Sequence, residues 1–167
     1  MLARRIHSGR VHSGKGTTVV EYALVLPFFL LLVLGMIDLG WYFFVEHTLQ
    51  YATREGMRLA LVGRKLMDES GNPMSREASI IKTIKDNASL AVDPSSLSIY
   101  IFPIGNDYTD PANWENLDPY AGGPGSYMRV KTRYTYNFLT PLIGAFFTGG
   151  NTLVEAQGTY RNELFDK

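Results

Sequence analysis

The chain has 167 residues, no cysteine, and equal numbers of basic and acidic residues, 16 of each. The lack of cysteine excludes disulfides, thiol catalysis and thiolate metal sites. Without its basic N-terminal tail the chain is mildly acidic, which argues against nucleic acid as a partner, because nucleic-acid binding calls for a basic patch. The length predicts a single modest domain beyond any membrane segment.

The N-terminal tail is basic and leads directly into a long apolar run. Residues 1–16 contain no acidic residue and four basic ones: Arg4, Arg5, Arg10 and Lys15. Residues 17–45 contain no Lys or Arg and are long enough to cross a bilayer as a helix, which takes roughly 20 residues. Basic residues before a membrane helix predict a cytoplasmic N-terminus. The chain is therefore predicted to cross the membrane once, with residues 67–167 on the extracytoplasmic side.

Glu21 is a carboxylate at the edge of this apolar run. Such a group is costly in lipid and usually has a partner. Lys15 could flank it at the membrane surface. Alternatively, cleavage after Gly16 would give Thr17 a new α-amine, which could neutralise Glu21 of a neighbouring subunit.

The residues around Gly16 form a pattern that combines a glycine, a glutamate five residues later and an apolar helix. The sequence reads GTTVVEYALVLP over residues 16–27 and QYATREGMRLA over residues 50–60. The first run resembles the processing site of type IV prepilins, and the two runs together resemble TadE-like proteins, which are minor pseudopilins of the tight-adherence (Flp) pilus system. The resemblance also includes Gly35, Asp38, Leu39 and Gly40.

This resemblance implies a function in assembling a pilus. A prepilin peptidase would cleave between Gly16 and Thr17, and Glu21 and Tyr22 would act in processing and assembly. The other implied partners are pilins, pseudopilins and membrane proteins of pilus assembly. The implied location is the bacterial cytoplasmic (inner) membrane, in or at the base of a surface pilus. No cofactor is implied.

Two further residues interrupt the apolar run. Pro27 removes one backbone hydrogen bond and predicts a kink in the transmembrane helix. Asp38 precedes the aromatic residues 41–44, which are typical of a membrane-interface belt. We therefore expect Asp38 near the membrane surface, and the alternative is a buried functional carboxylate.

The helix is predicted to continue through residues 46–66, with Gly63 just past its C-terminal end. One face of this extension has mainly small side chains at helical spacing: Leu49, Ala52, Thr53, Gly56, Leu59 and Ala60. This face must pack on the chain's own sheet or on a neighbouring subunit. The opposite face, which includes Arg54, Glu55 and Arg58, is typical of a solvated surface.

Residues 67–167 predict an extracytoplasmic α+β domain with a pilin-like arrangement. Ser75 can cap a second helix whose apolar stripe contains Ile80, Ile81, Ile84 and Ala88. Three segments, 97–102, 127–138 and 151–160, have strand patterns and predict a three-stranded antiparallel sheet. In the second, the residues from Met128 to Phe138 at every other position are expected to face the core, and Arg129, Lys131 and Arg133 to face away. Residues 139–147 predict a short helical or irregular turn that lies on the sheet or dips toward the membrane.

The segment 103–126 is a long loop rich in carboxylates and amides. Calcium prefers oxygen ligands of this kind, and the candidates are Asp107, Asp110, Asn113 and Asp118. Their spacing does not match the EF-hand loop, and the prolines and glycines favour an ordinary exposed loop that could contact a partner.

The sequence contains no catalytic constellation that can be assembled with any specificity. His7 and His12 lie in the tail expected to be removed, which leaves His47. We therefore predict a protein that is not an enzyme. The alternative to a pseudopilin is an uncleaved, membrane-anchored extracytoplasmic binding module.

Overall fold

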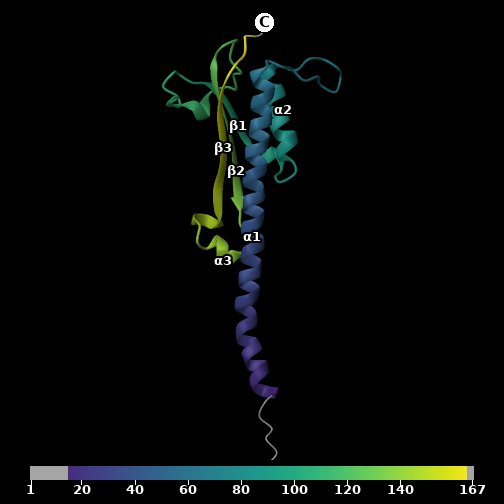
Figure 1. Ribbon diagram of the computed structural model, residues 1–167, viewed down its shortest axis with the longest axis vertical. Coiled ribbons are helices and arrows are strands. Elements are labelled where there is room, and N and C mark those ends of the chain that lie inside the picture. The colour runs from purple at the N-terminus through teal and green to yellow at the C-terminus, as the bar shows by residue number, and fades with distance from the viewer. Residues whose placement is uncertain (1–14, 165–167) are drawn as a thin grey trace, which may run out of the picture. The chain divides into compact units, whose positions relative to one another are not determined.

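The computed structural model describes residues 15–164 and has the predicted α+β architecture (Figure 1). By its internal contacts the chain divides into two compact units, Met1–Ile37 and Asp38–Lys167. The first helix, α1 (Lys15–Leu61), contains residues of both units. The leader residues 1–14, with their basic side chains and His7 and His12, lie outside the described residues.

Local signals set the ends of the helices. Gly63 has a left-handed φ of 67°, and its N–H donates to the carbonyl of Ala60 while that of Arg64 donates to Leu59. This pair of bonds satisfies carbonyls at the end of α1, as in a Schellman motif. The second helix, α2 (Arg76–Ala88), starts after Ser75, whose hydroxyl accepts from the N–H of Ala78 at 3.0 Å. The predictions for Gly63 and Ser75 are therefore confirmed.

The sheet has three antiparallel strands in the order β1 (Ser98–Pro103), β2 (Tyr127–Asn137) and β3 (Asn151–Arg161). Val130 in the central strand pairs with Ile101 on one side and with Gly158 on the other. The β2–β3 connection contains the one-turn helix α3 (Pro141–Gly144) and a 3-10 turn at Thr148–Gly150. The predicted turn over residues 139–147 is thus partly helical.

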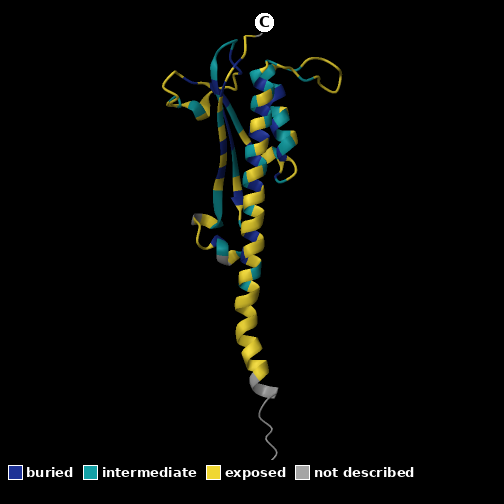
Figure 2. Ribbon diagram, viewed as in Figure 1, coloured by how far each residue is buried: buried dark blue, intermediate teal, exposed yellow. Residues whose placement is uncertain are grey.

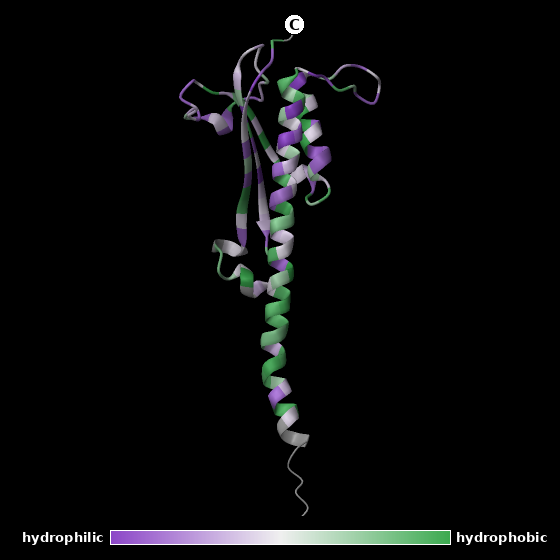
Figure 3. Cartoon of the chain, viewed as in Figure 1, coloured by the Kyte–Doolittle hydropathy of each residue, from purple (hydrophilic) through white to green (hydrophobic). Residues whose placement is uncertain are grey.

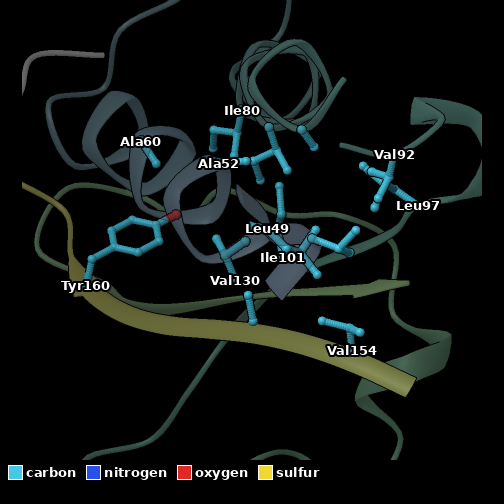
Figure 4. Packing of buried hydrophobic residues seen from close by; sticks show 14 of the residues in the cluster. Leu49, Ala52, Ala60, Ile80, Val92, Leu97, Ile101, Val130, Val154 and Tyr160 are labelled. Atoms are coloured by element: carbon cyan, nitrogen blue, oxygen red, sulfur yellow. The ribbon is translucent and has the colours of Figure 1, made fainter. Parts of the chain in front are cut away.

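The core lies where α1 and α2 pack against one face of the sheet (Figure 4). Leu49 and Ala52 come from α1, Ile80 from α2, and Ile101 and Val130 from the sheet, and all five are at most 1% exposed. The small-residue face of α1 therefore packs within its own domain, which decides between the two alternatives that the sequence left open. Burial on this scale is the main favourable term in folding.

Two glycines allow close contact between these layers. A Cβ on Gly56 of α1 would lie 2.4 Å from Cγ1 of Ile84 on α2, and one on Gly158 of β3 would lie 2.2 Å from Cε of Met57. Gly56 belongs to the TREG run of the sequence pattern, so its lack of a side chain has a packing reason.

The opposite face of the sheet is covered in part, which the sequence did not predict. Lys131 faces away from the core, as expected, but it is only 6% exposed. The loop after β1 folds back over it and places the ring of Trp114 4.3 Å from its ammonium. Trp114 also contacts the rings of Tyr100 and Phe102 from β1. Alternation distinguished the two faces correctly, but it could not show that a distant loop covers the second one.

The close contact at Gly56 gives a stability prediction. Gly56→Ala should lower the free energy of unfolding by about 1–2 kcal/mol, because overpacking against Ile84 exceeds the gain of up to about 1 kcal/mol in helix propensity. The matched control is Gly40→Ala, since a Cβ on Gly40 of α1 would meet no atom within 4 Å. Unfolding of the full chain in detergent, followed by near-UV circular dichroism, measures both. Equal stabilisation by Gly56→Ala and Gly40→Ala would contradict the close contact between Gly56 and Ile84.

Candidate functional site: helix α1 and its junction

The first part of α1 carries the residues expected to act in processing and assembly. Gly16 and Thr17 lie in its first turn, and Glu21 and Tyr22 are exposed. Within the described residues no ion pair involves Glu21. The helix is continuous through Pro27, and the predicted kink there stays a prediction.

Residues 18–37 present an almost entirely exposed apolar surface (Figures 2 and 3). Tyr22 is 70% exposed and Phe28 is 74% exposed, and most of the other large side chains of this stretch are exposed, with Leu31 and Val33 half-buried. Exposed apolar surface of this extent is typical of a membrane or protein interaction site. Among the residues that the structure describes, one helix, Thr18–Leu61, is long and apolar enough by length and composition to cross a membrane. This supports single-pass anchoring.

Asp38, the first residue of the second unit, is 1% exposed. The carboxylate is therefore buried within the domain, as the alternative has it, while its place near the membrane surface stays a prediction. Its Oδ1 accepts from the hydroxyl of Tyr136 at 3.0 Å and from the N–H of Leu139 at 3.2 Å. Its Oδ2 accepts from the N–H of Thr140 at 3.0 Å and from the Thr140 hydroxyl. Four donors from the end of β2 and the β2–β3 connection thus converge on one carboxylate.

The Asp38 contacts have a clear physical reason. Burying a carboxylate is costly unless hydrogen bonds replace its water, and here both oxygens are satisfied. Burial and the hydrogen bond to Asp38 raise the pKa of Tyr136 well above its ordinary value, so its hydroxyl stays protonated and donates. The ring of Tyr42, one turn along α1, packs against the rings of Tyr136 and Phe138.

A second internal contact ties the solvent-side half of α1 to the central strand. The hydroxyls of Thr53 and Thr132 are hydrogen bonded at 3.0 Å, and Thr53 also donates to the carbonyl of Leu49 at 2.8 Å. Both threonines are at most 1% exposed. On the opposite face of this half, Arg58 and Glu55 form an exposed ion pair, and His47 is exposed. That face matches the predicted solvated surface.

The four candidate calcium ligands of the loop do not gather around one point. Asp110 pairs with Arg129 and Lys131 of β2, whereas Asp107 accepts from Thr109, and Asn113 and Asp118 are exposed. Burial disfavours ionisation of Asp110, but hydrogen bonds from Lys131 and Arg129 outweigh it and hold the pKa of this carboxyl below its ordinary value. The residues that the structure describes include no group of three or more His, Cys, Asp or Glu side chains suited to a metal ion.

The C-terminal end of the domain closes against the last turn of α1. The amide of Asn162, 2% exposed, donates to the carbonyls of Ala121 and Gly123, each at 2.9 Å. The Arg76 guanidinium reaches the carbonyls of Ala60 and Gly122. These bonds join the C-terminal end of α1 near Ala60 to α2, to the loop after β1 and to the residue that follows β3.

Comparison with known proteins agrees with the sequence pattern. Residues 16–58 match the family model described as TadE-like protein. The match begins at Gly16, covers Glu21 and Asp38, and ends near the C-terminus of α1, which confirms the resemblance predicted from the sequence. No curated protein and no solved structure matches the chain.

The Asp38 contacts give a second stability prediction. Asp38→Asn should lower the free energy of unfolding by about 2–4 kcal/mol, because an amide replaces one acceptor oxygen with a donor that faces other donors. The full chain in detergent, unfolded by heat and followed by near-UV circular dichroism, provides the measurement.

The control is Asp86→Asn on α2, which breaks an exposed pair with Lys82 and should cost less than about 1 kcal/mol. In the double variant Asp38→Asn with Tyr136→Phe, the loss should be smaller than the sum of the two single losses, since the residues share one hydrogen bond. A cost for Asp38→Asn as small as that of the control would mean that the four bonds contribute little.

Proposed function

We propose that this chain, with its TadE-like N-terminal segment, is a non-catalytic, pseudopilin-like component in the assembly of a tight-adherence (Flp) type IV pilus. The proposal places it in the bacterial cytoplasmic membrane with a cytoplasmic N-terminus and an extracytoplasmic α+β domain. Its partners would be the prepilin peptidase, other pilins or pseudopilins, and the membrane proteins of pilus assembly.

The observation that carries the proposal is the contrast between the two parts of α1. The small-residue face from Leu49 to Ala60 packs on the chain's own sheet and α2. Residues 18–37 have no such cover and expose apolar side chains. A helix intended only to complete a soluble core would not present this surface. The N-terminal part is therefore available for contacts with lipid and with neighbouring subunits, and it is also where the family match begins.

The length of the uncovered stretch agrees with a membrane crossing. At 1.5 Å per residue, residues 18–37 form a helix roughly 30 Å long, close to the thickness of the hydrocarbon core. The proposed crossing therefore ends near Ile37, earlier than residue 45, since Asp38, Tyr42 and Val45 contact the domain.

Processing gives the first functional prediction. Co-expression with the prepilin peptidase should produce a mature chain that begins at Thr17, and Gly16→Leu should abolish cleavage, because a leucine side chain crowds a site that accepts glycine. The intact mass of the membrane-extracted protein, with and without the peptidase, measures it. Gly9→Leu in the leader is the matched control and should be cleaved normally. A chain that still begins at Met1 in the presence of active peptidase would favour the uncleaved binding module.

Glu21 gives the second functional prediction. In lipid a lone carboxylate is costly by a few kcal/mol, and the new amine of Thr17 on a neighbouring subunit would neutralise it. Glu21→Gln should leave membrane insertion intact and weaken co-purification with other pilins. Glu21→Leu should weaken it further, because glutamine keeps hydrogen-bonding capacity and leucine does not.

Cleavage and association must be measured separately on these variants, since a carboxylate could instead serve recognition by the peptidase. Glu69→Gln, in the exposed connection between α1 and α2, controls for loss of one negative charge. If fully cleaved Glu21→Leu co-purified with its partners and supported normal piliation, the pairing function of Glu21 would be excluded.

A further inference from the structure

The second unit carries a continuous aromatic surface around Asp38. The ring of Phe147 stacks on Phe138 at 4.3 Å, Phe138 stacks on Tyr42 at 6.1 Å, and Tyr42 meets Phe43 at 5.5 Å. Beside this row lie further exposed apolar side chains. This surface is called the aromatic rim below. Its most exposed members are Trp41 at 47%, Phe43 at 52%, Leu139 at 72% and Phe146 at 80%. The rim joins α1 to the β2–β3 connection.

The rim has no charged neighbours along the sheet. From Tyr134 to Val154 the sequence contains no Lys, Arg, His, Asp or Glu. The charged side chains of the two strands begin immediately outside this range, where Arg133 donates to Glu155 at 2.6 Å. One end of the sheet and its connection are thus apolar or uncharged, and the other end carries the ion pairs of Arg129, Lys131 and Arg133. Figure 2 shows that much of this connection is exposed.

Asp38 holds the β2–β3 connection, which is part of the rim, against the residue of α1 at which the second unit begins. Thr140 of the connection is hydrogen bonded to Asp38, and Asp38 directly follows Ile37, the last residue of the uncovered apolar stretch. The connection is therefore held at the residue where the proposed membrane crossing ends. A large exposed aromatic surface at that point, with an uncharged β2–β3 connection, matches the composition of the boundary between lipid headgroups and acyl chains.

We infer that the aromatic rim is a lipid-contacting surface, and that Leu139 and Phe146 enter the headgroup–acyl boundary of the extracytoplasmic leaflet. This inference rests on the proposed membrane anchoring. The domain would then touch the bilayer through two elements, α1 and the β2–β3 connection, rather than being tethered by α1 alone. Two points of contact restrict the tilt of the domain relative to the membrane surface.

The lack of cysteine makes a direct test possible, since a single introduced cysteine gives a single label. The full chain is reconstituted in liposomes of phosphatidylethanolamine and phosphatidylglycerol, with an NBD fluorophore on Phe146→Cys or, independently, on Leu139→Cys. Nitroxide-bearing lipids, labelled near the headgroup or deep in the acyl chain, then quench the fluorophore. Because both residues are at least 72% exposed, neither substitution should disturb the fold, which near-UV circular dichroism checks.

Two further labelled positions separate this inference from the anchoring itself. Leu90→Cys lies at another exposed apolar position of the same unit, at 76%, and Phe29→Cys lies in the proposed crossing. We expect labels at 146 and 139 to lose about half or more of their emission with the shallow quencher, label 29 to respond to the deep quencher, and label 90 to respond to neither.

Quenching at 29 without quenching at 146 and 139 would overturn the lipid contact and leave the anchoring intact. No quenching at 29 would overturn the anchoring and this inference with it. Blue-shifted emission at 146 that lipid nitroxides do not quench, and that grows with protein density, would show that a second copy of the chain covers the rim and would overturn the lipid contact.

Discussion

The hydrogen bonds of Asp38 are the constraint on which the division of α1 depends. A carboxylate within a long apolar helix would be unfavourable in a core and in lipid alike. Tyr136, Leu139 and Thr140 remove that penalty by supplying donors to both oxygens. In return, the β2–β3 connection is fixed to the helix at this residue. From Asp38 onward α1 belongs to the α+β domain, whereas residues 18–37 are left uncovered.

The rest of the domain uses the second part of α1 as its central element. Gly56 admits Ile84, Gly158 admits Met57, and the Thr53–Thr132 hydrogen bond links the helix to β2. These contacts bury the small-residue face of the helix within the domain. The N-terminal stretch keeps its apolar side chains exposed, and the proposed cleavage after Gly16 acts at the start of that stretch.

Most of the fold could be predicted from local patterns in the sequence. Gly63 and Ser75 marked helix ends through their backbone chemistry, and alternation marked the strands and the core face of β2. The environment of Asp38 was not readable in the same way, because its donors lie about a hundred residues later in sequence and carry no local signal. A useful signal was present, since a carboxylate in an apolar helix usually has a partner. The cover over Lys131 was missed because it comes from Trp114 in a loop without periodicity. For the proposed processing site, residues 16–27 carried the information.

The most direct test of the division at Asp38 is a nitroxide scan along α1 of the full chain in proteoliposomes, using one introduced cysteine at a time. Accessibility to oxygen, which concentrates in lipid, is compared with accessibility to a water-soluble nickel chelate. Labels at Phe28, Leu32 and Met36 should be accessible to oxygen, labels at Leu49 and Ala52 to neither reagent, and labels at Tyr51 and Arg58 to nickel. High oxygen accessibility at Leu49 and Ala52, or high nickel accessibility at Phe28 and Leu32, would contradict the account.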